Sequence, residues 1–265
     1  MQVFVEGVGL RGPGLNGWVA SRGILAGAEP YIPDELILPS QDLLPAAERR
    51  RMGLPAKLAL NIGLEALANS THPADTLASV FASSGADGQV IHQICESLAT
   101  EERDVSPTRF HNSVHNAPAG YWSIALRSRA PSTSLCCFDC SFVAGLLDAC
   151  AYCAAETEPV LLLSYDLPYP EPLNAARPIT GAVGAALLLA PRATSASFAQ
   201  LAVQVEPNDY QPTIMQDPAL EALRAGNPTA RALPLLAALS GCLSVPNLVL
   251  EYLRGTAVTV AVSRC

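Results

Sequence analysis

The apolar and polar positions along the chain follow two patterns, one typical of strands and one of helices. Residues 2–8 alternate apolar and polar side chains and end in glycines, which predicts a strand. Leu58, Ile62 and Leu67 recur at helical spacing behind Pro55, which predicts an amphipathic helix over 55–70. Similar runs predict further strands at 77–85, 131–137, 158–166, 183–190, 198–206 and 256–263. Helical patterns cover 87–100, 141–156, 217–225 and 246–254, and a proline-bounded loop from residue 106 enters another helix near Asn116. Strands that alternate with helices indicate a layered α/β fold, and the chain shows neither an internal repeat nor a linker, which favours one domain.

Charge and composition narrow the classes of partner. Half of the residues are apolar and only 15% are charged, with 24 acidic against 16 basic residues. Apart from Glu48–Arg51 the basic residues form no dense run, so we expect no nucleic-acid partner. The apolar run at 181–191 is shorter than the ~20 residues of a membrane span, so we expect a buried strand there and no membrane span. The N-terminal residues resemble a strand and a turn rather than an export signal, which predicts a cytoplasmic protein with eight reduced cysteines.

The glycines at 7–12 match the dinucleotide-binding pattern G-x-G-x-x-G. Pro13 and Gly14 stand where the phosphate-binding helix would begin, so the required strand–turn–helix unit is not formed. We therefore predict a tight glycine turn after the first strand, and no cofactor.

Two cysteine pairs and two histidines could bind a metal. Cys137-x-x-Cys140 and Cys150-x-x-Cys153 imitate a four-thiolate zinc site, but the second pair lies inside an apolar helical pattern, so buried thiols are favoured. His111 and His115 have ligand spacing without the glutamate of a metalloprotease helix. We predict loop histidines bonded to the backbone, and no metal site.

The stretch LCCFDCSF at 135–142 leaves two interpretations open. A cysteine at a helix N-terminus gains thiolate character, so one of these thiols could be a nucleophile. The predicted helix begins at about residue 140, and Asp139 immediately before it is a favourable N-cap residue. The alternative is therefore a capped helix whose neighbouring cysteines are packing residues.

Several features in order resemble the N-terminal half of a β-ketoacyl synthase, a thiolase-like condensing enzyme. They are residues 3–18, Ser106-Pro107, Asn116, Ala119-Gly120 and the segment APSTSL at 130–135. The register runs without a gap from Ser106 to Ala149 and continues more weakly to about residue 206. The resemblance implies a single thiolase-like domain over 1–265, a layered α/β/α fold with a reduced second half, in which about 1–206 are best preserved.

The chain departs from active members of that family at the nucleophile. Their strand runs into T-A-C-x-S-G, and the register places Asp139 on the cysteine, with Cys137 on the threonine. Cys140 comes one residue late, which on a helix turns it by ~100°. Active members also use two histidines in their second half, whereas this chain has none after His115. The resemblance therefore implies a noncatalytic chain-length-factor-type subunit that shapes the acyl pocket of an active β-ketoacyl synthase in a heterodimer. The chain is similar to the partner subunit of bacterial aryl polyene clusters, which implies a type II polyketide or fatty-acid-like pathway. The resemblance also implies that the chain meets the acyl carrier protein only through the complex.

In this family the strand before the nucleophile pairs across the dimer, which makes STSLCC at 132–137 the expected interface. Candidate pocket or interface residues are Ser134, Leu135, Cys136, Phe110, Phe138 and Phe142, although phenylalanines in such positions are more often plain core. Two alternatives remain. One is a divergent acyltransferase that uses Cys140 or Cys137, with His111 as base. The other is a homodimeric scaffold.

Overall fold

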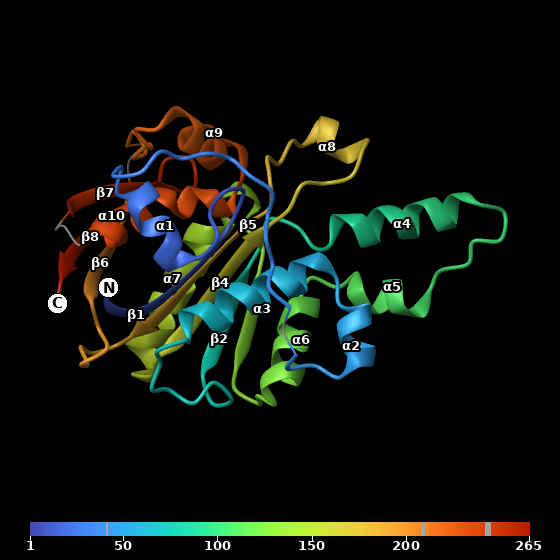
Figure 1. The fold of residues 1–265 in the computed structure, drawn as a ribbon, viewed down its shortest axis with the longest axis horizontal. Helices are drawn as coiled ribbons and strands as arrows, with labels where there is room; N and C mark the ends of the chain where they lie inside the picture. Colours follow the sequence, from blue (N-terminus) through green and yellow to red (C-terminus); the bar gives the residue numbers. More distant parts are fainter. Residues whose placement is uncertain (41, 208–209, 242–244) are drawn as a thin grey trace.

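A mixed sheet of eight strands runs through the computed structural model, which describes residues 1–40, 42–207, 210–241 and 245–265 (Figure 1). The strand order is β3-β2-β4-β5-β1-β6-β8-β7. β2 pairs with β3 and β4 in parallel, and all other neighbours are antiparallel. The strands are β1 (Gln2–Arg11), β2 (Ala78–Ala82), β3 (Ser132–Leu135), β4 (Val160–Asp166), β5 (Val183–Ala190), β6 (Ala199–Glu206), β7 (Val245–Glu251) and β8 (Ala257–Arg264).

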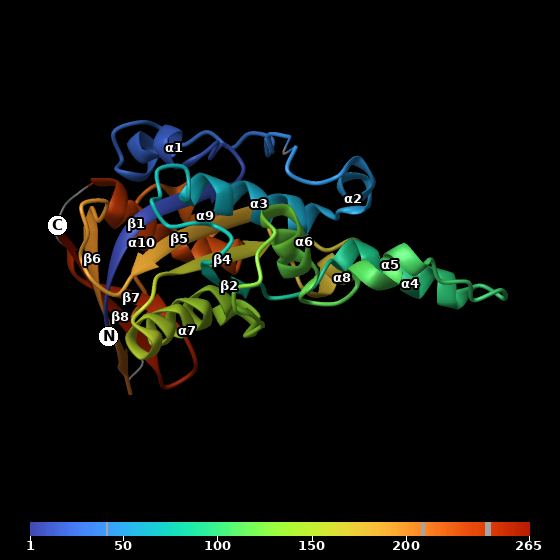
Figure 2. The same cartoon turned by 90° about the horizontal axis from the view of Figure 1, so that it is seen from below.

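Helices cover both faces of this sheet. α3 and α6 lie on one face and α7 on the other (Figure 2). The helices are α1 (Trp18–Leu25), α2 (Ala46–Arg51), α3 (Leu54–Ala66), α4 (Gly88–Ala99), α5 (Pro107–Asn112), α6 (Ala117–Leu126), α7 (Ser141–Glu156), α8 (Leu173–Ala176), α9 (Pro218–Gly226) and α10 (Leu233–Gly241), with 3₁₀ turns η1 (Phe138–Cys140) and η2 (Thr229–Ala232). α4 and α5 form an arm that extends beyond the end of the sheet (Figure 1). The predicted layered α/β/α fold is confirmed.

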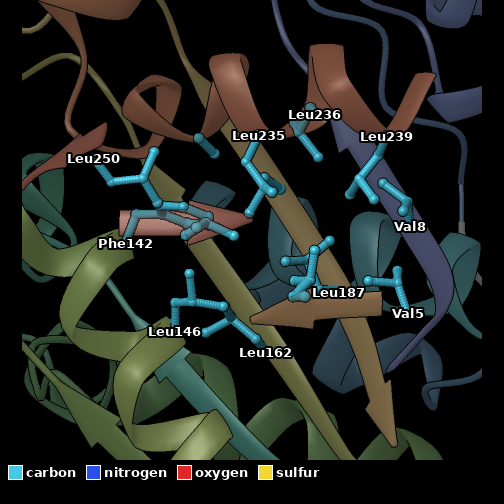
Figure 3. Packing of buried hydrophobic residues seen from close by; sticks show 14 of the residues in the cluster. Val5, Val8, Phe142, Leu146, Leu162, Leu187, Leu235, Leu236, Leu239 and Leu250 are labelled. Carbon is cyan, nitrogen blue, oxygen red and sulfur yellow. The ribbon is translucent and has the colours of Figure 1, made fainter. Parts of the chain in front are cut away.

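The main core lies between the sheet and the helices α7 and α10 (Figure 3). Phe142 and Leu146 of α7 face Leu162 of β4, while Leu235 of α10 points toward Leu187 of β5. All five side chains are buried. Because apolar residues on both faces of β4 and β5 are buried, these strands appear in the sequence as continuous apolar runs.

The predicted glycine turn after residue 8 is wrong, because β1 continues through Gly7 and Gly9 to Arg11. A Cβ atom at Gly7 would lie 1.9 Å from the carbonyl oxygen of Ala66, and one at Gly9 would lie 1.9 Å from that of Ile62. The glycines therefore let α3 approach the sheet closely, and the turn comes later, where Gly12 and Leu15 form a bridge.

Two further expectations about secondary structure are corrected. The predicted helix at 246–254 is strand β7, because its apolar residues pair with β8 and only the sheet neighbour distinguishes a short apolar strand from a helix. The expected loop from residue 106 contains α5, with Pro107 in its first turn. Sequence patterns also missed α1, α2 and α10.

The two edges of the sheet differ. At the β7 edge, the Thr213 backbone N–H donates to the Val249 carbonyl at 2.9 Å, and Val249 N–H donates to Thr213 Oγ1 at 2.9 Å. At the β3 edge, the carbonyls of Pro131 and Leu135 accept hydrogen bonds from β2. Because backbone groups alternate sides along a strand, those of Ser132 and Ser134 face away from β2.

Candidate functional site at the turn between β3 and α7

Asp139 does not cap α7, contrary to the prediction. The N-cap position of α7 is Cys140, which makes no side-chain cap hydrogen bond. The Asp139 carboxylate instead pairs with two guanidinium groups, with Oδ1 at 3.0 Å from Arg177 and Oδ2 at 3.3 Å from Arg231. Arg231 also lies 3.2 Å from Glu251. Asp139 is therefore the centre of an ion-pair network that joins η1 to the loop before β5, to η2 and to β7.

Ser141 organises the turn in place of an N-cap. Its Oγ accepts a hydrogen bond from Cys137 N–H at 3.0 Å and donates one to the Phe138 carbonyl at 2.7 Å. Cys140 N–H donates to the Cys137 carbonyl at 2.9 Å. The backbone from Cys137 to Ser141 is thus fixed by local bonds, which leaves the Asp139 side chain free to reach its arginines.

Phe138 adopts a left-handed backbone conformation with φ of 51° and is 60% exposed. The Arg177 guanidinium carbon lies 3.5 Å from its ring centroid, a cation–π contact. Phe142, one helical turn later, is only 1% exposed and belongs to the core, so its side chain is not open to a partner.

The thiols of the turn have separate hydrogen-bond partners. Cys140 Sγ donates to the Tyr252 carbonyl at 2.8 Å, and Cys136 Sγ donates to the Ser84 carbonyl at 3.3 Å. Burial raises the pKa of the Cys140 thiol, Arg231 lowers it, and Cys137, Glu251 and Asp139 raise it further. Cys140 is therefore a weaker nucleophile than an ordinary cysteine at neutral pH.

The second cysteine pair lies in the core rather than at this turn. Cys150 and Cys153 are buried on α7, and burial raises the pKa of each thiol to about 12. Across the described residues, no three His, Cys, Asp or Glu side chains gather as metal ligands would. The stretch Phe138–Glu156 is the one described helical segment long and apolar enough to cross a membrane, but its apolar side packs on the sheet as a core helix.

Two of the predicted interface residues, Ser134 and Leu135, lie on the edge strand β3, and Cys136 follows it directly, whereas Phe110 lies on α5 in the arm. Ser134 and Leu135 on β3 are partly exposed, Cys136 is exposed, and Phe110 on α5 is 68% exposed. An open groove of about 520 Å³ runs beside β3, and its lining comprises His115, Asn116, Ala119, Gly120, Ser123, Ser132 and Ser134. Five of these seven residues have polar side chains.

The histidines do not approach the cysteines of the turn. His115 Nε2 lies 3.2 Å from the Ser83 carbonyl, as predicted for a histidine bonded to the backbone. His111 lies on α5, not in a loop, and its ring makes an edge contact with Tyr121. No described contact links His111 to Cys140 or Cys137.

Sequence reasoning missed a buried carboxyl group, Asp166, at the end of β4. Oδ1 accepts hydrogen bonds from Ser84 N–H at 2.7 Å, Ser84 Oγ at 2.6 Å and Ser83 Oγ at 3.3 Å, and Oδ2 accepts one from Thr229 Oγ1 at 2.8 Å. Burial raises the pKa of Asp166, and these hydrogen bonds oppose the rise. The group ties the ends of β2 and β4 to η2. The polar residue that ends the apolar run VLLLSYD was the available signal.

Comparisons with known proteins bear on this arrangement. A model of the β-ketoacyl synthase N-terminal domain matches residues 26–237. A search of curated proteins finds no match.

Among solved structures, the ketosynthase ApeO in complex with its chain length factor ApeC from Xenorhabdus doucetiae matches with a TM-score of 0.75 at 20% identity, covering 98% of this chain and 99% of that one. The ishigamide ketosynthase/chain length factor has a TM-score of 0.69 at 13% identity, and each chain is covered to 99%. The AntDE:AntF complex, a type II polyketide acyl-carrier protein with its ketosynthase bound to the hexaketide, has a TM-score of 0.71 at 12% identity, with 100% and 99% coverage. At these identities the likeness concerns the fold.

Proposed function

Since this chain belongs to the β-ketoacyl synthase N-terminal-domain family, we propose that it acts as a noncatalytic, chain-length-factor-type subunit. It pairs with an active β-ketoacyl synthase and limits the space for the growing acyl chain. An acyl carrier protein meets it only through that complex, in the cytoplasm, in a type II polyketide or fatty-acid-like pathway such as aryl polyene synthesis. Its near-complete overlap in length with chains from ketosynthase/chain length factor complexes supports this assignment.

The observation that carries the proposal is the state of Asp139. The family register puts this residue on the nucleophilic cysteine, and its carboxylate is held by Arg177 and Arg231. A carboxylate held by two guanidinium groups is a far poorer acyl acceptor than a cysteine thiolate. The nearest thiol, Cys140, donates its proton to the Tyr252 carbonyl and has a raised pKa. Both facts support a turn that no longer transfers acyl groups.

The open edge of β3 supports the pairing. Ser132 and Ser134 direct backbone donors and acceptors away from β2, and an exposed edge of this kind is a template for another strand. Phe138, which follows β3 in the turn, and Phe110 on α5 add exposed apolar side chains that a partner could cover. We therefore assign Ser134, Leu135, Cys136, Phe110 and Phe138 to the interface, and Phe142 to the core.

The narrow pocket beside Tyr165 and His115 supports an acyl space formed mainly by the partner. It holds about 10 Å³, close to the volume that one water molecule needs. An acyl chain does not fit there. In this proposal the subunit closes the partner's pocket from the outside, and exposed side chains at the interface set its length.

Co-expression with an active ketosynthase from the same genome tests the pairing, and light scattering gives the stoichiometry. We expect a 1:1 complex. Ser134→Pro removes the outward backbone donor without breaking a bond to β2, because proline is tolerated on an edge strand. It should abolish the complex, whereas Ser134→Ala should keep it. A stable homodimer that excludes the ketosynthase would support the scaffold alternative instead.

Acyl transfer by the chain itself is tested with an acylated carrier protein and intact-mass measurement. The proposal expects no acylated chain. Stoichiometric acylation that disappears in Cys140→Ala or Cys137→Ala would establish the acyltransferase alternative.

A further inference from the structure

Cys137 and Cys140 have a geometry that the proposed function does not use. The hydrogen bond from Cys140 N–H to the Cys137 carbonyl, 2.9 Å long, closes a turn between residues i and i+3. Such a turn holds the two Cα atoms within about 7 Å, and disulfides span Cα separations of roughly 4.4–6.8 Å. The backbone therefore holds the two Cα atoms at a separation that a disulfide can span.

The two side chains also share one small region. Cys140 Sγ lies 2.8 Å from the Tyr252 carbonyl, and the charges of Cys137 and Cys140 both raise the pKa of the Tyr252 hydroxyl. Cys137 in turn raises the pKa of Cys140. Cys137 and Cys140 are partly exposed, whereas Cys150 and Cys153 are buried on α7. A small oxidant can therefore reach this pair and not the other.

We propose that Cys137 and Cys140 form a reversible intrachain disulfide by exchange with a low-molecular-weight aliphatic disulfide. The Cys137 thiolate attacks one sulfur of the reagent, forming a mixed disulfide and releasing one thiolate. Cys140 then loses its proton to solvent and attacks the Cys137 sulfur, which releases the second thiolate. Two cysteine thiols are oxidised, one external disulfide is reduced, and the released thiolates take up the two protons.

The order of attack follows from the contacts. The Cys140 thiol donates to a carbonyl and its pKa is raised, so we assign the first attack to Cys137. Bond formation removes the thiol donor from the Tyr252 carbonyl. Oxidation therefore loosens the contact between the turn and the end of β7, next to Glu251 of the ion-pair network.

The test uses the full chain, incubated with oxidised glutathione and then quenched with N-ethylmaleimide. After reduction, iodoacetamide labels the cysteines that had been oxidised, and peptide mass spectrometry locates them. We expect iodoacetamide on Cys137 and Cys140 together, an intact mass lower by two hydrogens before reduction, and full reversal by dithiothreitol. Hydrogen exchange near Tyr252 should become faster in the oxidised chain.

Variants separate this pair from its neighbours. Cys137→Ser should abolish the internal bond and leave Cys140 at most as a mixed disulfide, and Cys140→Ser should do the converse while keeping a hydroxyl donor for Tyr252. Cys136→Ser is the matched control and should oxidise like the wild type. Unchanged N-ethylmaleimide labelling of Cys137 and Cys140 in the wild-type chain would overturn the inference, as would a bond that involves Cys136 or a second molecule. Neither result bears on pairing with a ketosynthase.

Discussion

Phe138 and Phe142 lie four residues apart, one exposed and one buried, so the substitution Phe→Ala can be compared in both environments. Phe142 is 1% exposed and packs in the core between α7, β4 and α10, whereas Phe138 is 60% exposed and contacts Arg177. Replacing each by alanine removes the same side chain from a buried helical position and from an exposed position in the turn.

The expected costs differ severalfold. Truncating a buried phenylalanine removes its transfer free energy and leaves a cavity, which together cost about 3–5 kcal/mol. Phe138→Ala loses an exposed cation–π contact worth about 0.5–1 kcal/mol. For 265 residues the unfolding entropy near the midpoint is about 0.56 kcal/mol/K. The midpoint should therefore fall by about 5–9 °C for Phe142→Ala and by about 1–2 °C for Phe138→Ala.

Differential scanning calorimetry of the two variants and the wild type measures both shifts. Urea unfolding followed by circular dichroism provides the free energies, and equal m-values confirm that the unfolded states are comparable. Similar midpoint losses in both variants would refute the assignment of Phe142 to the core and Phe138 to the surface. Under the proposed function, binding of the ketosynthase ranks the two variants in the opposite order. Phe138→Ala should weaken the complex more than the small loss in stability of this variant explains.

Three further predictions follow from other residues. In Asp166→Asn the hydrogen bonds are kept if Nδ2 donates to Thr229 Oγ1 and Thr229 donates to Ser164 Oγ, so the free energy of unfolding should hardly change. Asp166→Ala leaves Ser84 N–H buried without a partner, and urea unfolding should show a loss of about 1–3 kcal/mol. Burial raises the Asp166 pKa, so the contribution of this group to stability is complete below its ordinary pKa of 3.8 and is lost as the pH rises through the folded pKa. The free energy of unfolding of Asp166→Asn should therefore rise relative to that of the wild type as the pH rises. A difference that does not depend on pH would contradict this. Gly9→Ala places a Cβ against the Ile62 carbonyl and should unfold the chain, while Gly120→Ala on α6, with open space at its Cβ, should stabilise it by about 0.5–1 kcal/mol in thermal unfolding. N-ethylmaleimide should label Cys95 and Cys265 in the native chain and reach Cys150 and Cys153 only after denaturation, as peptide mass spectrometry can establish.

The sequence predicted the elements whose pattern is local. The helix at 141–156 and the strand at 183–190 have the boundaries expected, because the helix keeps one apolar side throughout and the strand is an uninterrupted apolar run. α10 was missed because it is buried almost all round, so no polar face marks its period. β7 was mistaken for a helix because its pairing with β8 decides its conformation.

At the candidate site, too, the local features could be predicted and the contacts between distant residues could not. Asp139 lies in the turn just before α7, close to the predicted start of that helix, but the N-cap role assigned to it was wrong. Its partners, Arg177 and Arg231, are 38 and 92 residues away in the chain, and no local pattern connects them to it. Asp166 escaped notice for the same reason, since its hydrogen-bond donors come from β2 and η2.

The unequal edges of the sheet limit what edge-to-edge growth can build. At Val249 of β7 both backbone groups are occupied by Thr213, whereas Ser132 and Ser134 of β3 direct theirs outward. A sheet with one open edge has no free edge left after it pairs once, so edge-to-edge pairing stops at two sheets and does not build a fibre. Under the proposed pairing through β3, the two hydrogen bonds of Thr213 thus keep Val249 from becoming a second pairing point at the opposite edge.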